Sequence, residues 1–279
     1  MLSRLPRAIE IYRTEGGAVL GRRLVGSLRR VSANATRSAA FYRAVLTGRR
    51  TLQFGGARAT FRVTRDDFDK VYDNVESERA LYDRLLEDLR PTDVVWDVGA
   101  NVGTVACLAG DVVRRGHVVT FEPHPLNLVR LETNLRENDV SATVLGRALS
   151  DEEGELEMVM WDGRVGSGLH DPQTLDTTDR RMLTVPAVRG DDLVRAGDVP
   201  SPTVLKIDVE GAELSVLYGL EETLRGGECR SIYCEVHADR IGDHGGSVEE
   251  LRGLLEGWGY TLTTIQERNR DFHVLATRT

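Results

Sequence analysis

The chain has 279 residues, of which 41% are hydrophobic and 29% charged, and its formal net charge is −8. This length suits one large domain with an extension, and the composition is that of an ordinary globular protein. The pattern contains no apolar run of 18 residues and so predicts no membrane-spanning helix, and the acidic balance disfavours a nucleic-acid partner.

The first 50 residues differ in charge from the remainder. They carry eleven arginines against two glutamates, a balance of +9, so residues 51–279 carry −17. Leucines recur every four residues from Leu20 to Leu28 among these arginines, which predicts a basic helical extension over residues 1–50. Such a helix suits peripheral contact with an anionic membrane, a cap on the acidic body, or a homodimer interface. The sequence leaves these three alternatives open.

The cysteines indicate a reducing compartment. Cys107, Cys229 and Cys234 are odd in number and have no CxxC spacing, so neither a disulfide framework nor a zinc site is predicted. The N-terminus lacks the continuous apolar core of a secretory signal. We therefore expect a cytoplasmic protein, and the basic extension adds the inner face of the membrane as a possible location.

Residues 51–90 are expected to lead into the core. Residues 51–63 alternate weakly around Gly55 and Gly56, as a β-hairpin does. Residues 75–89 follow with a helical pattern that ends before Pro91.

From residue 91 to residue 279 the pattern alternates between strand and helix. Core strands are expected at 94–97, 118–122, 142–145, 204–208 and 231–236, and helices at 102–114, 125–137, from about 212, and 247–257. Strands at 156–161 and 183–187 flank a polar loop, 162–181, which is long enough for a lid or for a mobile insertion. The segments 260–265 and 272–277 read as a closing antiparallel hairpin. The alternation predicts an α/β domain with a mostly parallel sheet.

A glycine-rich turn follows the first core strand. Asp97 ends the strand, and Gly99 and Gly103 lead into a helix, so the backbone can approach a ligand closely. Glu122 ends the next strand, where a carboxylate can accept hydrogen bonds from both hydroxyls of a ribose. Asp97 would repel the pyrophosphate of a dinucleotide but suits the ammonium group of methionine, directly or through backbone and water. The turn therefore favours S-adenosylmethionine over a nicotinamide cofactor.

Five blocks in this order resemble the FkbM-type methyltransferases: DVGANVG, FEPHP, ALSDEEGE, LKIDVEGAE and CEVH. The resemblance covers about residues 91–272. It implies the Rossmann-like class I methyltransferase fold, with a seven-stranded, mostly parallel sheet whose last strand is antiparallel. It also implies S-adenosylmethionine as methyl donor and usually a hydroxyl acceptor on a sugar or a natural product.

The resemblance carries over to individual cofactor-binding positions. It places Asp97, Gly99, Asn101 and Gly103 on the methionine side, Glu122 at the ribose, and Ala148, Leu149 and Asp151 near the adenine. Ala100, Pro123 and Asp208 lie in the same blocks and complete the cofactor-binding set.

A second group of polar residues is expected at the same sheet edge. Asp208 ends its strand beside the cofactor, Glu210 and Glu213 begin the next helix, and Glu235 and His237 share one side of the following strand. A general base would speed methyl transfer to an alcohol by about 10²–10⁴-fold. His237 is the first candidate and Asp208 the second, with Glu210 in the same catalytic set.

Other interpretations of this group stay open at the sequence level. Glu210 and Glu213 suit a helix start, His237 suits a structural role, and Lys206 suits neutralisation of an acidic edge. Asp208, Glu210 and His237 suit Mg²⁺ as an alternative, although no fixed ligand spacing supports a metal and none is assigned.

The leading function is S-adenosylmethionine-dependent O-methylation of a sugar, a glycan (lipid-linked glycans included) or a similar small molecule. The alternatives are a small-molecule N-methyltransferase and a non-catalytic S-adenosylmethionine-binding scaffold. The absence of an (N/D)PP(Y/F) tetrapeptide after the fourth core strand disfavours the common amino-group methylators.

Overall fold

The fold is taken from a computed structural model, which describes residues 42–44, 46–63, 74–160, 169–170, 181–268 and 271–278. The chain divides into two units, residues 1–50 and 51–279, so the 51–90 segment belongs with the core. Most of the basic extension, with its expected membrane or dimer contact, lies outside the described residues, as does most of the 162–181 loop. Within the described ranges, no helix has the length and apolarity needed to cross a bilayer.

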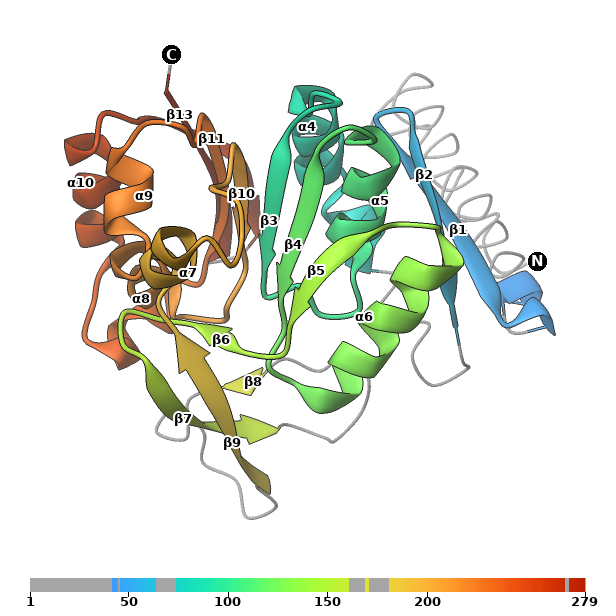
Figure 1. The fold of residues 1–279 in the computed structure, drawn as a ribbon, viewed down its shortest axis with the longest axis horizontal. Helices are drawn as coiled ribbons and strands as arrows, with labels where there is room; N and C mark the ends of the chain where they lie inside the picture. The colour runs from blue at the N-terminus through green and yellow to red at the C-terminus, as the bar shows by residue number, and fades with distance from the viewer. Residues whose placement is uncertain are drawn as a thin grey trace, which may run out of the picture. The chain divides into compact units, whose positions relative to one another are not determined.

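The elements follow one another as strands and helices in alternation (Figure 1). The strands are β1 (Arg49–Phe54), β2 (Ala57–Arg62), β3 (Val94–Val98), β4 (His117–Phe121), β5 (Ala142–Leu145), β6 (Ala148–Leu149), β7 (Gly154–Met160), β8 (Leu169–His170), β9 (Arg181–Val188), β10 (Val204–Ile207), β11 (Ser231–Val236), β12 (Thr261–Arg268) and β13 (Asp271–Thr277). The helices are α3 (Asn74–Ser77), α4 (Arg79–Asp88), α5 (Thr104–Val112), α6 (Pro125–Glu137), α7 (Gly190–Ala196), α8 (Glu213–Tyr218), α9 (Glu221–Arg225), the 3₁₀ helix η4 (Ile241–His244) and α10 (Val248–Gly257).

Seven strands form the central sheet in the order β12-β13-β11-β10-β3-β4-β5. Pairing is parallel from β11 through β10, β3 and β4 to β5, whereas β13 runs antiparallel to both β11 and β12. The expected class I methyltransferase architecture, with its antiparallel last strand, is thereby confirmed. The strand order reverses between β3 and β10, which is where open α/β sheets bind their ligands.

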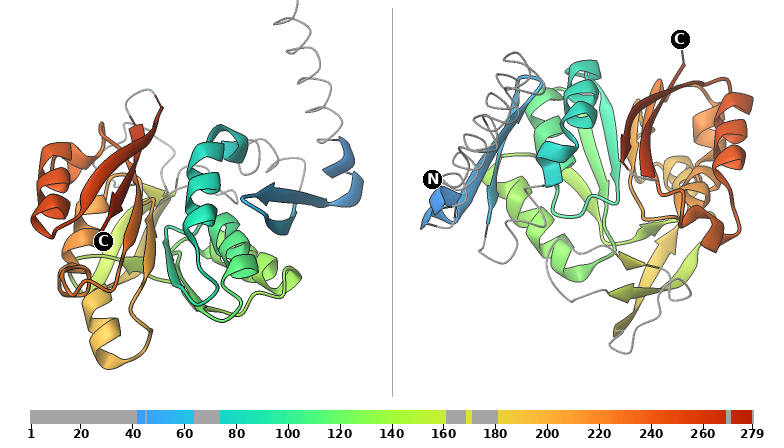
Figure 2. Two further views of the ribbon diagram at one scale, coloured as in Figure 1. Left: turned by 90° about the horizontal axis from the view of Figure 1, so that it is seen from above. Right: turned by 180° about the vertical axis from the view of Figure 1, so that it is seen from behind.

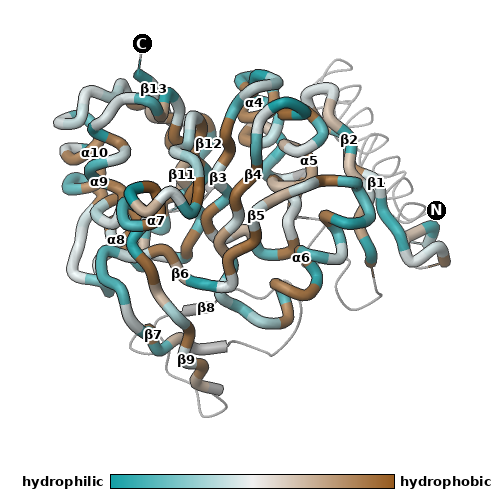
Figure 3. Tube along the Cα trace, viewed as in Figure 1, coloured by the Kyte–Doolittle hydropathy of each residue, from teal (hydrophilic) through white to brown (hydrophobic). Residues whose placement is uncertain are grey.

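Helices cover both faces of this sheet. Figures 1 and 2 show α8, α9 and α10 on one face and α4, α5 and α6 on the other. The central strands are almost entirely buried, and Figure 3 shows the hydrophobic stretches running along them. Trp96, Leu205 and Ile207 pack there with side chains of α8 and α10 in one continuous core. The apolar strand patterns thus bury themselves between two layers of helices, as parallel sheets require.

The hairpin around Gly55 and Gly56 is present and is bonded to Asn134 in the last turn of α6 and to Asn138, the C-cap residue of that helix. Asn138 Oδ1 accepts from the Thr60 amide at 2.6 Å, and its Nδ2 donates to the Thr60 carbonyl at 2.7 Å. This side chain therefore pairs with the edge of β2 as a neighbouring strand would. Asn134 donates to the Val102 carbonyl at 2.8 Å, which ties α6 to the glycine-rich turn.

The predicted strands that flank the polar loop are present as β7 and β9, and they pair antiparallel in a separate sheet of order β6-β9-β7-β8. Two features differ from the expected pattern. The helix predicted over residues 75–89 is interrupted at Glu78 and forms α3 and α4. The short elements α7, α9 and η4 were not predicted, because four to seven residues show too little periodicity to stand out.

Candidate functional site

The glycine-rich turn between β3 and α5 is held against the end of β10. Gly99 has φ of +73°, and a Cβ on it would lie 1.9 Å from the backbone oxygen of Asp208. Asn101 and Gly103 are also left-handed, with φ of 52° and 84°. The turn thus needs glycine at position 99 for both its conformation and its close approach to β10.

Glu122 lies at the end of β4, directly beside this turn. Its Oε2 accepts from the Asn101 amide at 2.6 Å and its Oε1 from the His124 amide at 2.8 Å. The residue is 5% exposed and lines the cavity described below. Burial raises the pKa of Glu122 to about 7, although both amide hydrogen bonds favour the charged form.

Asp97 is fully buried at the end of β3. Its Oδ2 accepts from the Ala106 amide of α5 at 3.0 Å, and its Oδ1 lies 3.2 Å from Lys206 Nζ. Burial raises the pKa of Asp97 above its usual range, while Lys206 opposes this effect. The carboxylate therefore fixes the start of α5 and meets a buried cation, and it does not line the cavity.

A cavity opens where the ends of β3, β4 and β10 meet. Nine of the residues singled out from the sequence line it: Gly99, Asn101, Glu122, Pro123, Ala148, Leu149, Asp151, Asp208 and Glu210. Asp97, Ala100, Gly103, Glu213, Glu235 and His237 were also singled out and are not among its lining residues. The structure thus brings the glycine-rich turn, Glu122 and the segment around Ala148 and Leu149 around one space.

Further lining residues were not singled out from the sequence: Val98, Phe121, Asn127, Arg147, Ser150, Leu156, Glu157, Met158, Val209, Ala212, Ser215 and His244. Some of them, such as Ser150 and Val209, are neighbours in sequence of residues in the motifs. Their position next to a motif was a signal that could have predicted them as lining residues. Met158 on β7 and His244 on η4 carried no such signal, because the second sheet and the 3₁₀ helix place them there.

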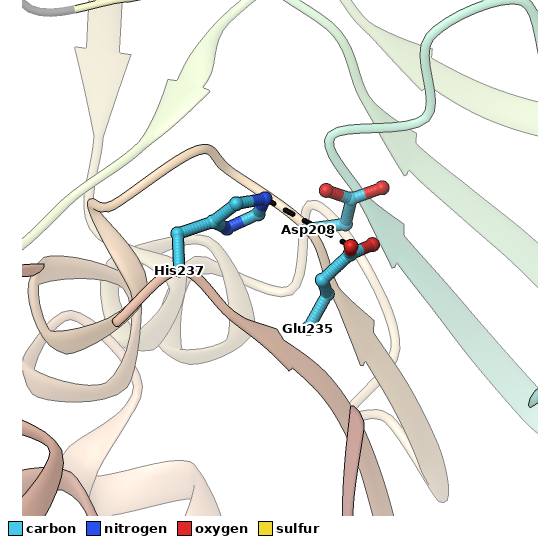
Figure 4. Close-up of side chains that lie close together, drawn as sticks. All are labelled: Asp208, Glu235 and His237. Carbon is cyan, nitrogen blue, oxygen red and sulfur yellow. Dashed lines mark ion pairs between the residues drawn. The ribbon is translucent and has the colours of Figure 1, made fainter. Parts of the chain in front are cut away.

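Three side chains converge at the edge of β10 and β11. Figure 4 shows Asp208, Glu235 and His237 pointing toward one another, with one ligand-capable atom from each within 4.8 Å of the others. The cation-binding set suggested by the sequence contained Glu210, and in the structure Glu235 stands in this group instead. His273 of β13 lies 3.2 Å from Glu235, and Lys206 Nζ lies 3.4 Å from Asp208.

His237 is held by buried Glu213. Its Nδ1 lies 2.7 Å from Glu213 Oε1, and its Nε2 lies 3.4 Å from Glu210 Oε2 and 4.0 Å from Glu235 Oε1. Burial disfavours the charged imidazole, but the bond to Glu213 and the nearby carboxylates, Asp208 among them, outweigh it and raise the pKa of His237 to about 9. His237 is therefore protonated at neutral pH.

Asp208 and Glu210 are the carboxylates of this edge that face the cavity. Burial works against ionisation of Asp208, yet Lys206 and His237 prevail and lower its pKa. Glu210 has a left-handed backbone, φ 56°, and pairs with Arg240 of the segment before η4. Both carboxylates thus have a cationic partner, Lys206 for Asp208 and Arg240 for Glu210.

The chain is similar in sequence to known methyltransferases. Residues 97–262 match the family model described as the methyltransferase FkbM domain. The hexuronic acid methyltransferase AglP of Haloferax volcanii is 33% identical over 71% of this chain and 75% of its own length. The 31-O-demethyl-FK506 methyltransferase FkbM of Streptomyces tacrolimicus is 28% identical over 82% of this chain and 96% of its own.

Among solved structures, a methyltransferase FkbM from Methylobacillus flagellatus superimposes with a TM-score of 0.49 at 17% identity. The match covers 76% of this chain, and the chain spans about half (48%) of that protein.

Proposed function

This chain belongs to the FkbM family of S-adenosylmethionine-dependent methyltransferases, and we propose that it methylates a hydroxyl oxygen of a sugar unit. The observation that carries the proposal is the cavity, in which the turn around Gly99 and the carboxylate of Asp208 face one space. A relative named for a hexuronic acid supports a sugar acceptor. The relative named for an O-demethyl substrate supports oxygen as the accepting atom.

The cavity fits S-adenosylmethionine by its shape and its charge. Gly99 and Asn101 of the turn line the cavity, so the turn is placed to contact a ligand there. Glu122 presents a buried carboxylate for the ribose hydroxyls, and Ala148 and Leu149 offer an apolar edge for the adenine. When bound, the cofactor supplies a methyl group on a positively charged sulfur. The acidic lining suits that charge.

Asp208 is the acceptor base in this proposal, and His237 is its charged neighbour. The sequence put His237 first, but it is not among the residues that line the cavity, and its pKa is raised to about 9. Asp208 is ionised and faces the cavity, so its oxygen is placed to accept the hydroxyl proton. Its low basicity suits a late proton transfer, because the hydroxyl becomes acidic as its oxygen forms the new bond.

The test is transfer of labelled methyl groups to a panel of acceptors. Methyl glycosides of glucose, galactose, glucuronic acid and glucosamine are incubated with the full chain and S-adenosyl-[methyl-¹⁴C]methionine, and the products are mapped by mass spectrometry. We expect an O-methyl sugar. Methylation confined to the amine of glucosamine would refute oxygen as the acceptor, and no transfer to any sugar would refute the sugar class.

Two substitutions test the base. Asp208→Asn keeps the shape and should lower kcat about 100-fold or more. His237→Gln should lower kcat less, because Gln keeps a polar group beside Glu213 but loses the charge. The reverse order of the two effects would return the base role to His237.

We further propose that transfer needs no divalent cation. Asp208, Glu235 and His237 have ligand atoms close enough to hold one. However, the ammonium group of Lys206 already pairs with Asp208, and His237 carries a proton that a metal would have to displace. Turnover unchanged by EDTA is the expected result. Turnover lost with EDTA and restored by Mg²⁺ would refute it.

We also propose that the basic segment, residues 1–50, attaches the protein to the anionic inner face of the membrane. The charge balance of +9 supports this, as each basic residue near such a surface contributes about 1 kcal/mol. Co-sedimentation of the full chain with phosphatidylserine vesicles, compared with neutral vesicles, tests it. Equal sedimentation would refute the membrane role, and a dimer in ultracentrifugation would favour the alternative of a homodimer helix.

A further inference from the structure

Lys206 stands at an unusual place for a lysine. It lies on β10 in the middle of the central sheet and is 6% exposed. Its partners in register are Asp97 on β3 and Tyr233 on β11. A buried ammonium group is costly unless it is paired, and such a pair is weak evidence for a purely stabilising role.

The ammonium group of Lys206 contacts both the glycine-rich turn and the carboxylate of Asp208. It donates to the Gly99 carbonyl in the cofactor turn at 3.0 Å. It lies 3.2 Å from Asp97 and 3.4 Å from Asp208. One cation thus contacts the turn, the carboxylate that anchors α5, and the carboxylate at the acceptor side.

The partners of Lys206 differ in freedom. Asp97 is fully buried and bonded to the amide of Ala106, so it is fixed. The Asp208 side chain is 33% exposed, and Lys206 is the cation nearest to its carboxylate among the described residues. Other charged or titratable groups around it are Glu235, His237, His273 and Tyr82. Asp208 therefore owes its orientation largely to a lysine that is itself fixed by Asp97 and Gly99.

We propose that Lys206 is a positioning residue that links the cofactor turn to Asp208, so that cofactor binding and the orientation of the acceptor carboxylate are coupled. A ligand that adjusts the turn moves the Gly99 carbonyl, and the ammonium group transmits that adjustment to Asp208. The inference rests on the proposed function for the role of Asp208. The link itself concerns cofactor affinity and is measured without an acceptor.

The test is a double-mutant cycle on S-adenosylmethionine affinity, measured by calorimetry on the full chain. The cycle combines Lys206→Met with Asp208→Asn. If the two side chains act through one link, the loss in the double variant is smaller than the product of the single losses, by at least about fivefold. Independent effects, whose fold-changes multiply, would overturn the proposal.

Urea unfolding of the same four proteins separates this link from a structural role. A purely structural contact couples the two residues in stability but leaves the affinity of the folded proteins uncoupled. Because Lys206→Met leaves buried Asp97 unpaired and could prevent folding, the cycle is repeated with Asp97→Asn in all four proteins. Arg225→Met, which removes an exposed cation paired with Glu221, is the control and should leave affinity unchanged.

The two proposals can fail separately. Wild-type turnover in Asp208→Asn would remove its role as base, while the affinity cycle would still show or refute the link. An intact base role with multiplicative affinity losses would refute the link alone.

Discussion

Two glycines of the cofactor turn have nearly the same backbone but different neighbours, and this allows a controlled substitution. At Gly99 a new Cβ would lie 1.9 Å from the Asp208 oxygen and 2.9 Å from its carbonyl carbon, both backbone atoms. At Gly103 it would lie 2.4 Å from a δ-methyl of Leu131, with the next atoms at 3.7 Å. Their φ values of 73° and 84° give alanine the same left-handed strain, about 1–2 kcal/mol.

The neighbours make the difference in expected cost. Ordinary contact begins at 3.4 Å, so Gly99→Ala must separate two backbone segments by about 1.5 Å. That displacement breaks the bond from the Asp208 amide to the Val98 carbonyl, 3.1 Å, for about 1 kcal/mol more. With overpacking of about 1–3 kcal/mol, Gly99→Ala should cost about 4 kcal/mol or more. Gly103→Ala should cost about 2 kcal/mol, because the Leu131 side chain can rotate away.

Urea unfolding and calorimetry with S-adenosylmethionine measure both effects. Gly99→Ala should lose cofactor affinity by at least about 100-fold, since the turn and Asp208 are forced apart, whereas Gly103→Ala should stay within about tenfold. Leu131→Val removes the δ-methyl and should recover part of the Gly103→Ala loss in the double variant. Equal costs for the two glycine substitutions, or unchanged affinity in Gly99→Ala, would refute this account of the turn.

Three further outcomes are expected. The pKa of Glu122 is raised to about 7, so its carboxylate takes up a proton and loses acceptor capacity as the pH drops from 8 to 6. S-adenosylmethionine affinity should fall over the same range. An affinity that calorimetry finds constant between pH 8 and pH 6 would contradict the ribose role of Glu122. The pKa of His237 is raised to about 9, so the stability that the charged imidazole gives to the folded protein is present below pH 6.5 and is lost as the pH rises through 9. Between pH 6 and pH 10 the free energy of urea unfolding should therefore fall by about 3 kcal/mol more in wild type than in His237→Gln. Plots of that free energy against pH that run parallel for the two proteins would contradict this. Arg230 pairs at 2.9 Å with Asp93, which is 4% exposed and lies at the opposite end of the strands from the cavity. Arg230→Met leaves this carboxylate without its cation, so the free energy of unfolding should fall by about 3–5 kcal/mol while the folded protein keeps its cofactor affinity. A loss of stability no larger than that of the exposed control Arg225→Met would contradict this.

The parts of the fold that sequence predicts well are those whose pattern is local. The strand ends at Asp97, Glu122 and Asp208 follow from apolar runs that stop at a polar residue, and parallel strands bring such ends to one edge. The terminal hairpin likewise follows from two alternating segments around a turn. Which of the carboxylates faces the cavity depends on register and side-chain packing. The sequence therefore places Asp97 and Asp208 alike, while the structure buries the first and exposes part of the second.

The less predictable parts depend on contacts between distant segments. β7 lines the cavity because it pairs with β9, and a polar loop separates these strands in sequence. The sequence leaves His237 either as a base or as a structural histidine, and only the structure shows that Glu213, 24 residues away, bonds its Nδ1 and helps to raise its pKa to about 9. Lys206 could have been predicted from the sequence to have an anionic partner, because a lysine inside an apolar strand is buried and a buried ammonium group is costly unless it is paired. The register with Asp97 was needed to identify that partner.

Charge balance gives a physical reason for Asp208 as the proton acceptor. Glu210 pairs with Arg240, and Glu213 with the protonated His237, whereas Lys206 serves both Asp97 and Asp208. The two carboxylates of Asp97 and Asp208 therefore share one ammonium group, which leaves one surplus negative charge among these three side chains. That surplus faces a cofactor with a positive sulfonium.

When bound, S-adenosylmethionine would supply its methyl carbon to the acceptor oxygen, the electron pair of the carbon–sulfur bond would stay on sulfur, and the positive charge of the sulfonium would be lost. If Asp208 takes the hydroxyl proton, its negative charge disappears in the same step. The net charge beside Lys206 then returns to balance without the movement of another ion. In a site of low dielectric constant, where uncompensated charge is expensive, a protonated His237 offers no such balance, because it has no free electron pair to receive the proton. The carboxylate that shares its cation is thus the group best suited to accept the proton.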